Sequence, residues 1–311
     1  MNTLRSTGTR ILRALALWFD NDAARPESAS RIDLIRVLPF IGLHFACLGV
    51  LWTGWSPVAI GVAIALYAGR MFAITGFYHR YFSHRAFRAA RPVQFLMAVA
   101  GAAAAQRGPL WWAAHHRHHH ARADRAGDAH SPHLHGFLWA HTGWFLAREN
   151  FATDLDAVRD WARYPELRFL DRYDALVPTL LGVALYGVGA WLAVHHPELG
   201  TSGPQLLVWG LAISTVALYH ATFLVNSLAH CLGTRRYPTR DDSRNNVVIA
   251  LLTLGEGWHN NHHHFPGAAR QGFYWWEIDV TYYGLRLMAA LGLVRDLRPV
   301  PAALRDARSR R

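Results

Sequence analysis

The sequence predicts an all-α membrane protein with four transmembrane helices, arranged as two hairpins, under a helical cytoplasmic cap. Three observations support this prediction. The 311 residues are 52% hydrophobic and only 17% charged, so the chain is more apolar than an ordinary soluble domain. Long apolar stretches are joined alternately by short and long polar segments. Arginines fill the long segments and are absent from the short ones, as expected when alternate loops face opposite sides of a membrane.

Four apolar stretches are candidates to cross a bilayer, for which a helix needs about 20 mainly apolar residues. No Asp, Glu or Arg occurs in residues 37–69, which are interrupted only by the turn-like segment TGWSP at 53–57. We therefore expect a first hairpin with spans 37–54 and 57–78. A second hairpin is expected from 175–196 and 204–229, which a short linker with Gly and Pro joins. The arginine distribution places both termini and the middle region in the cytoplasm.

Two further apolar segments are not expected to span the membrane. Residues 10–19, RILRALALWF, have the pattern of an amphipathic helix lying on the membrane surface; this helix belongs to an N-terminal cytoplasmic segment, 1–35. Residues 93–107 are too short to cross and are expected to be buried or half-inserted. The remainder forms one membrane-embedded domain, 36–295, followed by an Arg-rich C-terminal tail, 296–311.

Composition also limits the function. The formal net charge of +11 comes from arginine alone, because the chain has no lysine. Such a surface suits acidic lipid headgroups, phosphate-bearing substrates or an acidic partner, and no nucleic-acid-binding motif is present. Only two cysteines occur, Cys47 and Cys231, which excludes a disulfide scaffold and a cysteine-ligated cluster. Abundant Ala and Arg without Lys indicate a GC-rich bacterial genome, and hence the inner membrane.

Nine histidines lie at or beyond the predicted cytoplasmic ends of the spans. They come from HRYFSH after the second span, HRHHH in the middle region, the end of the fourth span and HNNHH further along. The nine are His79, His84, His116, His119, His120, His230, His259, His262 and His263. Since none lies in the middle of a span, they can gather on one side of the membrane.

Helical spacing explains how these histidines could form a metal site. Each residue of a helix advances by about 100°, so the three histidines of an H-x-x-H-H box can point inward together, and two boxes can face each other. Asn226 and His230 are four apart and share a face. His79 and His84 are five apart, or about 140°, so they must flank the site or the helix must deform.

Not every histidine is expected to bind a metal. A single box could be a solvated basic patch, but several on one side of the membrane favour a metal site. Nine imidazoles and an amide suit two ions, while imidazole alone leaves Zn, Cu, Fe and Ni open. The others are expected to pack inside a span (His44), to lie on the opposite surface (His195, His196) or to point away from the ligand face (His115, His118, His264).

Four motifs resemble those of the membrane-bound acyl-CoA desaturases of the stearoyl-CoA, delta-9-like type. They are AITGFYHRYFSHRAF (73–87), HRHHH (116–120), FLVNSLAH (223–230) and GEGWHNNHHHFP (255–266), and the resemblance extends over about residues 36–295. It implies four spans under a cytoplasmic cap and a cis double bond introduced into a saturated long acyl chain. It also implies two iron ions held by the nine histidines, with Asn226 near one iron through a water, and O2 as co-substrate.

The resemblance also implies residues that position the substrate. Gln106, Trp112 and Thr222 match the side chains that bend the family's substrate tunnel. Asp128 and Glu256 are candidates to orient ligating histidines through their second ring nitrogens, or else ordinary surface carboxylates. Arg148 is expected to contact the headgroup, but the chain departs from the family's headgroup pattern at Ala114-His115, Glu149 and Phe223. The carrier is therefore left open between CoA, a carrier protein and a phospholipid.

No C-x-x-C pair, haem-ligating domain or Gly-rich dinucleotide fingerprint is visible in the sequence. An external electron donor is therefore expected, a ferredoxin, a cytochrome b5 or a flavoprotein reductase, docked on the Arg-rich face. One alternative function is a related di-iron hydroxylase with the same ligands. The other is a His-rich metal transporter or metal-sensing membrane protein, which the sequence disfavours because transporters coordinate near the bilayer midplane, where these spans offer little beyond His44 and His220.

Overall fold

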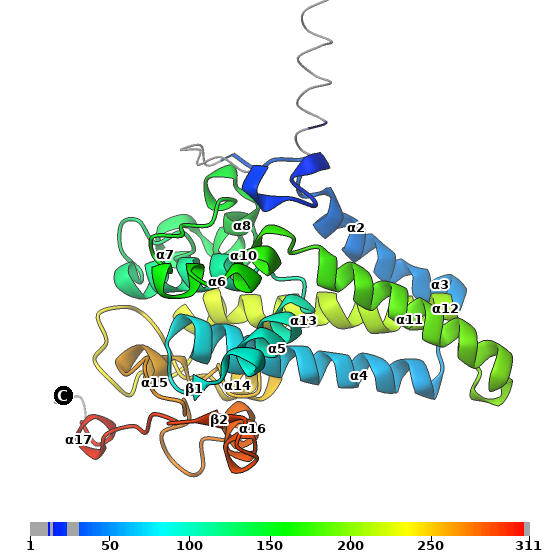
Figure 1. Ribbon diagram of the computed structural model, residues 1–311. Coiled ribbons are helices and arrows are strands. Elements are labelled where there is room, and N and C mark those ends of the chain that lie inside the picture. Colours follow the sequence, from blue (N-terminus) through cyan, green and yellow to red (C-terminus); the bar gives the residue numbers. More distant parts are fainter. Residues whose placement is uncertain (1–11, 13–14, 24–30, 308–311) are drawn as a thin grey trace, which may run out of the picture.

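The computed structural model describes residues 12, 15–23 and 31–307, and nearly all of its regular structure is helical (Figure 1). The long apolar helices lie side by side and extend toward one end of the molecule. Shorter helices, among them α6 (Pro109–Arg122), α7 (Pro132–His135), α10 (Pro165–Arg172) and α15 (His259–His264), lie at the other end. Of the predicted surface helix 10–19, residues 10, 11, 13 and 14 lie outside those described.

Within the described residues, three helices are long and apolar enough to cross a membrane: Pro57–Ser83, Leu176–His195 and Gly203–His230. The first consists of α4 (Pro57–Phe72) and the π-helix η3 (Ala73–Ser83), and the second is α11. The third consists of α12 (Gly203–Leu206), η7 (Leu207–Ile213), α13 (Ser214–Asn226) and η8 (Leu228–His230). These helices match three of the four predicted spans.

The predicted span 37–54 is shorter than expected. It forms the apolar helix Leu38–Thr53, built from α2 (Leu38–Ala46), η2 (Cys47–Gly49) and α3 (Val50–Thr53). At 1.5 Å per residue it is about 24 Å long, less than the roughly 30 Å of a bilayer core. Length and composition therefore support three spans and an additional short apolar helix.

Side-chain caps explain where two of the spans begin. Ser56 accepts a hydrogen bond from the N–H of Ala59 at the start of α4, and Ser202 accepts one from Gln205 at the start of α12. Each cap is followed by a proline in the first turn, where a missing N–H costs nothing. Before the first cap, Gly54 turns the chain with φ of 64°. The predicted hairpin turns therefore lie where these helices start.

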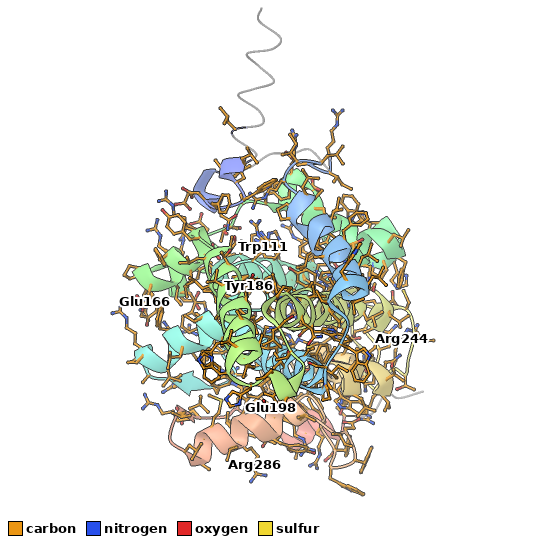
Figure 2. All side chains as sticks on the ribbon, turned by 90° about the vertical axis from the view of Figure 1, so that its right-hand side faces the viewer. Trp111, Glu166, Tyr186, Glu198, Arg244 and Arg286 are labelled. Atoms are coloured by element: carbon orange, nitrogen blue, oxygen red, sulfur yellow. The ribbon has the colours of Figure 1, made fainter. Side chains whose placement is uncertain are left out.

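The bundle buries the charged side chain of Arg70 and exposes many apolar ones. Arg70 is 3% exposed, and the partners of its guanidinium are the carbonyls of Leu66, Ala103 and Gly210 and the hydroxyls of Ser214 and Thr215. On α11, large apolar side chains such as Val183 and Trp191 are more than half exposed. An exposed apolar surface of this kind is typical of contact with lipid. Viewed along the bundle, Glu166, Arg244 and Arg286 lie at the periphery (Figure 2).

The remaining elements are shorter than the spans. Helix α5 (Arg91–Ala102) is 12 residues long, too short to span, as expected for this segment. A two-stranded antiparallel ribbon pairs Arg88 with Arg295 and Ala89 with Val294. The other elements are η1 (Asn21–Ala23), β1 (Arg88–Ala89), η4 (Trp139–Gly143), α8 (Trp144–Leu146), η5 (Arg148–Asn150), α9 (Arg159–Ala162), η6 (Pro197–Leu199), α14 (Val247–Leu252), α16 (Val280–Ala290), β2 (Val294–Arg295) and α17 (Ala302–Arg305).

The C-terminal segment packs beside α15. The backbone carbonyl of Leu304 lies 3.0 Å from Nε2 of His264, and the carbonyl of Arg305 accepts hydrogen bonds from the hydroxyls of Tyr237 and Tyr274. Part of the predicted Arg-rich tail is thus an ordered support for the third histidine motif.

Candidate metal centre

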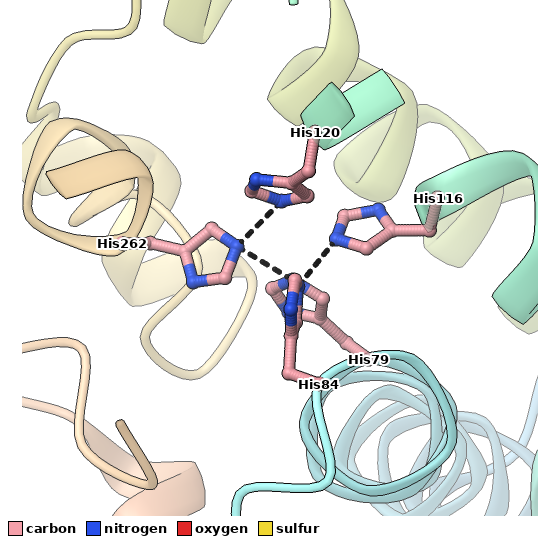
Figure 3. A group of neighbouring side chains, drawn as sticks. All are labelled: His79, His84, His116, His120 and His262. Atoms are coloured by element: carbon pink, nitrogen blue, oxygen red, sulfur yellow. Dashed lines mark hydrogen bonds between the residues drawn. The ribbon is translucent and has the colours of Figure 1, made fainter. Parts of the chain in front are cut away.

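The nine predicted histidines gather into two groups on neighbouring elements. In each group, one ring nitrogen of every member lies within 4.8 Å of those of the others. The five-histidine group consists of His79, His84, His116, His120 and His262 (Figure 3). The four-histidine group consists of His119, His230, His259 and His263.

Helix α6 and helix α15 each contribute to both groups. His116 and His120 of α6 belong to the five-histidine group and His119 to the other, whereas on α15 only His262 belongs to the five-histidine group. Positions i and i+4 lie about 40° apart on a helix, while i+3 lies about 60° away on the other side. The spacing H-x-x-H-H therefore directs two rings toward one group and the third toward its neighbour.

The helix geometry changes where His79 and His84 lie. In a π-helix the backbone N–H bonds to the carbonyl five residues earlier, and the N–H of His84 lies 3.2 Å from the carbonyl of His79 at the end of η3. Residues five apart then lie about one turn apart, and the ring centroids of His79 and His84 are 4.9 Å apart. The deformation that this spacing requires is the π-helix.

Ring nitrogens of the five-histidine group converge at short distances. Nε2 of His84 lies 2.8 Å from Nε2 of His116, and Nε2 of His262 lies 3.0 Å from that of His79 and 2.9 Å from that of His120 (Figure 3). Five nitrogen atoms facing one another within such a volume are the donor set of a first-row transition metal such as iron, copper or zinc.

Unpaired nitrogens indicate that the four-histidine group also fits a metal ion. Nε2 of His119 and Nε2 of His263 are buried and have no hydrogen-bond partner. Leaving a buried polar nitrogen unpaired costs about 1–3 kcal/mol. Because the Nδ1 atom of each ring already faces a carboxylate, the free Nε2 atom is available as a ligand, and a metal ion would pair both nitrogens at once.

Burial keeps most of these rings in the neutral form that binds metal. Loss of solvent, reinforced by the neighbouring histidines, lowers the pKa well below its usual value at several positions. They are His84, His116, His120, His259 and His262. Burial also lowers the pKa of His263 to about 4, although Asp241 opposes this shift. Neutral imidazole therefore dominates at physiological pH.

Both predicted carboxylates contact histidines of the two groups. Asp128 lies 3.1 Å from Nδ1 of His119, and Glu256 hydrogen-bonds Nδ1 of His79 while it pairs with Arg80 at 3.0 Å. Burial alone would raise the pKa of Asp128, but its hydrogen bonds with His119 and with the N–H of Asp124 hold it below the usual range. Asp128 is therefore ionised.

Two further carboxylates were not foreseen. Asp124 lies 2.8 Å from Nδ1 of His230, and Asp241 lies 3.0 Å from Nδ1 of His263. For both, burial alone would raise the pKa, but the histidine partner and neighbouring hydrogen bonds lower it below its usual value. The sequence gives little indication that these two carboxylates contact histidines. Asp124 follows the second box by four residues, whereas Asp241 lies in a polar segment between the motifs.

A third unforeseen carboxylate positions helix α6. Oδ1 of Asp171 accepts hydrogen bonds from the N–H groups of Leu110 and Trp111 at 2.9 and 2.7 Å, in the first turn of α6. This turn leaves N–H groups that the helix cannot satisfy itself. Asp171 therefore fixes the end of the helix that carries the second histidine box.

A largely apolar cavity of about 380 Å³ reaches both groups. His79, His116, His119 and His259 line it, and so do Gln106, Trp112, Thr222 and Asn226. Nε2 of Gln106 donates to Oγ1 of Thr222 at 2.7 Å, and the indole of Trp112 stacks on His116 with centroids 5.0 Å apart. The three predicted tunnel residues and Asn226 therefore share one cavity with the histidines.

The backbone next to the tunnel residues is unusual. Ala105 and Arg107, on either side of Gln106, have φ of 55° and 69°, a left-handed conformation that residues other than glycine seldom adopt. Such conformations persist where surrounding contacts enforce them, often at functional sites. The turn aims Gln106 into the cavity.

Arg148 is placed differently from the other predicted residues. It pairs with Asp33 at 3.0 Å and is not among the side chains that line the cavity. Two other arginines, Arg36 and Arg107, do line it. Loss of solvent and the charge of Arg107 lower the pKa of Arg36 to about 9, so the two guanidinium groups lie in one electrostatic environment.

Several remaining histidines form contacts outside the two groups. His44 and His220 are linked through their Nε2 atoms at 3.2 Å, and Nδ1 of His220 lies 3.0 Å from Nε2 of His141. His195 and His196 are exposed, and His118 lies at the surface beside Asp154. The histidines nearest the middle of the spans thus bond to one another.

Together, the fold and the site define a helical membrane protein with two adjacent histidine groups that share an apolar cavity. A family model described as fatty acid desaturase matches residues 53–292, so the chain belongs to the fatty acid desaturase family and is an oxidoreductase. It is 35% identical over 272 residues to the sn-1 stearoyl-lipid 9-desaturase of Anabaena variabilis, an alignment that covers 86% of this chain and 94% of that one.

Similar relatives act on different carriers, as their names state. The chain is 36% identical over 270 residues to an acyl-CoA 5-desaturase of Anemone leveillei, with 86% of this chain and 79% of the relative covered. It is 36% identical over 271 residues to the chloroplastic palmitoyl-monogalactosyldiacylglycerol delta-7 desaturase of Arabidopsis thaliana, with 86% and 69% covered. Desaturation is common to all three names, whereas the carrier and the bond attacked differ.

Proposed function

We propose that the protein is an O2-dependent di-iron desaturase that introduces a cis double bond into a saturated long acyl chain. The observation that supports this most strongly is that two histidine groups line one apolar cavity. Two iron ions bound there would supply, from O2 and two electrons, the oxidising power that removing hydrogen from an unactivated methylene requires. The acyl chain would lie in the cavity.

The nine histidines divide the ligand roles in this proposal. The five-histidine group holds one ion and the four-histidine group the other, with Asn226 nearest the second because Asn226 precedes His230 of that group by four residues. Fewer protein ligands at the second ion leave room for a water. Asp128 and Glu256 hold His119 and His79 in the tautomer whose other nitrogen faces the metal.

The cavity residues determine which bond is attacked. The Gln106–Thr222 hydrogen bond connects the segment before α6 to α13, and Trp112 packs against the ligand His116. Together they form a rigid wall that holds one pair of methylenes near the site. A displacement of only about 1 Å in such a wall is enough to slow a reaction strongly.

The substrate is a long-chain fatty acyl thioester or an acyl lipid, the two classes that occur among the relatives' names. Arg36 and Arg107 line the cavity and are better placed than Arg148 to meet an anionic headgroup. Arg148, as the predicted headgroup contact, would have to leave its pair with Asp33. We propose one domain over about 36–295, with both termini and the cap in the cytoplasm of a bacterium whose inner membrane holds the spans.

Electrons are proposed to come from a separate ferredoxin, cytochrome b5 or flavoprotein reductase docked on the arginine-rich face. Metal transport is a poorer explanation, since the nine histidines lie beyond or at the ends of the spans, and His44 and His220 bond to each other.

The test is the fatty-acid profile of a host that expresses the protein with a ferredoxin and its reductase. We expect a new monounsaturated species with the wild type and with His195→Ala, whose ring is exposed, and none with His263→Ala. A hydroxylated product would replace the desaturase assignment with the di-iron hydroxylase. Full activity of His263→Ala would remove that histidine from the ligand set.

A further inference from the structure

The second ring nitrogens of the two histidine groups have different partners. In the four-histidine group, three of the four Nδ1 atoms lie within hydrogen-bond distance of a carboxylate. These pairs are His119 with Asp128 at 3.1 Å, His230 with Asp124 at 2.8 Å and His263 with Asp241 at 3.0 Å. All three imidazole side chains are nearly inaccessible to solvent.

The five-histidine group has a single carboxylate partner among the residues that the structure describes. Glu256 bonds to Nδ1 of His79, and its charge is shared with the buried guanidinium of Arg80. Within the described part of the chain, the other four members have no carboxylate contact, and their short contacts are to one another.

The carboxylates of the four-histidine group accept further hydrogen bonds from backbone N–H groups and a hydroxyl. Asp124 accepts from the hydroxyl of Ser131 and the N–H of Asp242, and Asp241 accepts from the N–H of Ser243. Asp128 accepts from the N–H groups of Asp124 and His130. These additional donors are neutral, and among the described residues none of the three carboxylates pairs with an arginine. Their charge is therefore directed toward the histidines.

A carboxylate on one nitrogen of an imidazole makes the other nitrogen a stronger ligand, and losing such a partner typically weakens metal binding about 10–100-fold. The four-histidine group has three carboxylate partners and the five-histidine group has one. This difference contributes more to metal affinity than the one additional neutral imidazole of the five-histidine group. We infer that the two metal sites are unequal: the four-histidine group binds its ion first and more tightly. This inference rests on the proposed function.

The same arrangement assigns a role to Asp124 and Asp241. They are positioning residues, because each acts on the metal only through a histidine. Replacing either by asparagine keeps an oxygen that accepts the Nδ1 hydrogen bond but removes the charge, so the fold should persist while the affinity falls. Glu256→Gln is the matching change at the other group. Asp154→Asn is the control, since Asp154 bonds at 2.8 Å to His118, an exposed histidine outside both groups.

The experiment adds one equivalent of Fe2+, without oxygen, to the metal-free full-length protein and measures occupancy at each group by anomalous diffraction at the iron edge. We expect at least a tenfold greater occupancy at the four-histidine group. Asp124→Asn and Asp241→Asn should each reduce this preference about 10–100-fold, whereas Asp154→Asn should leave it unchanged and Glu256→Gln should increase it.

Equal occupancy, or preference for the five-histidine group, would overturn this inference and leave the proposed function intact. An unchanged preference in both aspartate variants would also overturn it, because the carboxylates would then not cause the difference. If neither group took up iron, both this inference and the di-iron function would fail.

Discussion

The side-chain amide of Gln106 donates to the hydroxyl of Thr222 at 2.7 Å, although the two residues are 116 positions apart in the chain. Thr222 uses its own hydrogen on the carbonyls of Leu218 and Tyr219, so it is free to act as the acceptor. This bond joins the two sides of the cavity between the left-handed turn before α6 and helix α13.

Replacing Thr222 by valine should change the position of the double bond. The variant keeps the shape of the side chain but leaves the Gln106 amide without its partner, at a cost of about 1–3 kcal/mol. The amide will then move, and this movement will change the bend of the cavity. Mass spectrometry of the products should show lower yield and more than one double-bond position. Thr142→Val, which removes a hydroxyl bonded only to the carbonyl of Leu138, should yield the wild-type product.

Adjacent histidines offer a matched test of the ligand set. His120→Ala should lower bound iron to about one ion per chain or less and abolish turnover, because His120 belongs to the five-histidine group. His118→Ala should change neither, since His118 is bonded to Asp154 at the surface. Metal analysis of both purified proteins makes the comparison. Equal iron contents would mean that α6 does not direct His120 at a metal.

Asp171 should make stability depend on pH. Burial raises the pKa of Asp171 to about 6, against opposing hydrogen bonds from Trp111 and Thr153. Since the folded protein then binds the proton more tightly than the unfolded chain, the stabilisation is complete below the usual pKa near 3.8 and is lost as the pH rises through 6. The total is about 3 kcal/mol.

Asp171→Asn should remove this pH-dependent part, because the amide oxygen can still accept from Leu110 and Trp111. Thermal unfolding of both proteins between pH 4 and pH 7.5, in one detergent, measures the difference. The wild-type midpoint should fall relative to the variant as the pH rises. Parallel curves would show that Asp171 does not titrate in this range.

Arg70 should be necessary for the packing of the spans. Its guanidinium bonds to three carbonyls and two hydroxyls on several segments, so Arg70→Leu leaves buried polar groups unpaired. We expect a lower thermal midpoint, corresponding to about 1–3 kcal/mol or more. Arg286→Leu, on the exposed face of α16, should have little effect. A midpoint equal to that of the wild type would mean that Arg70 contributes no net stability.

The sequence was sufficient to predict the nine histidines that gather, because H-x-x-H-H on a helix brings its rings to one region whatever the surroundings. The spacing also separates His119 and His262 from the other histidines of their boxes, but which group each of them joins depends on how α6 and α15 face each other, and the sequence does not show that. Asp124 reaches His230 across 106 positions, a contact that only the folded chain creates.

The spans, too, could be predicted only in part from the sequence. Hydrophobicity predicted three of them. The five-residue spacing of His79 and His84 predicted that either the two rings flank the site or the helix deforms, and the structure has a deformed helix, the π-helix of Ala73–Ser83. Counting apolar residues overestimated the first span, because the helix ends at Thr53 and Gly54 turns away with φ of 64°. The family motif predicted that Arg148 contacts the substrate headgroup, whereas in the structure Arg148 pairs with Asp33.

The most direct test of the central claim uses the purified, iron-loaded protein with O2, a reduced ferredoxin and a saturated long-chain substrate deuterated along its acyl chain. The account predicts a product that has lost two deuterium atoms from adjacent carbons and gained no oxygen, and none when His263→Ala replaces the wild type. A product that has gained one oxygen, or turnover without bound iron, would contradict it.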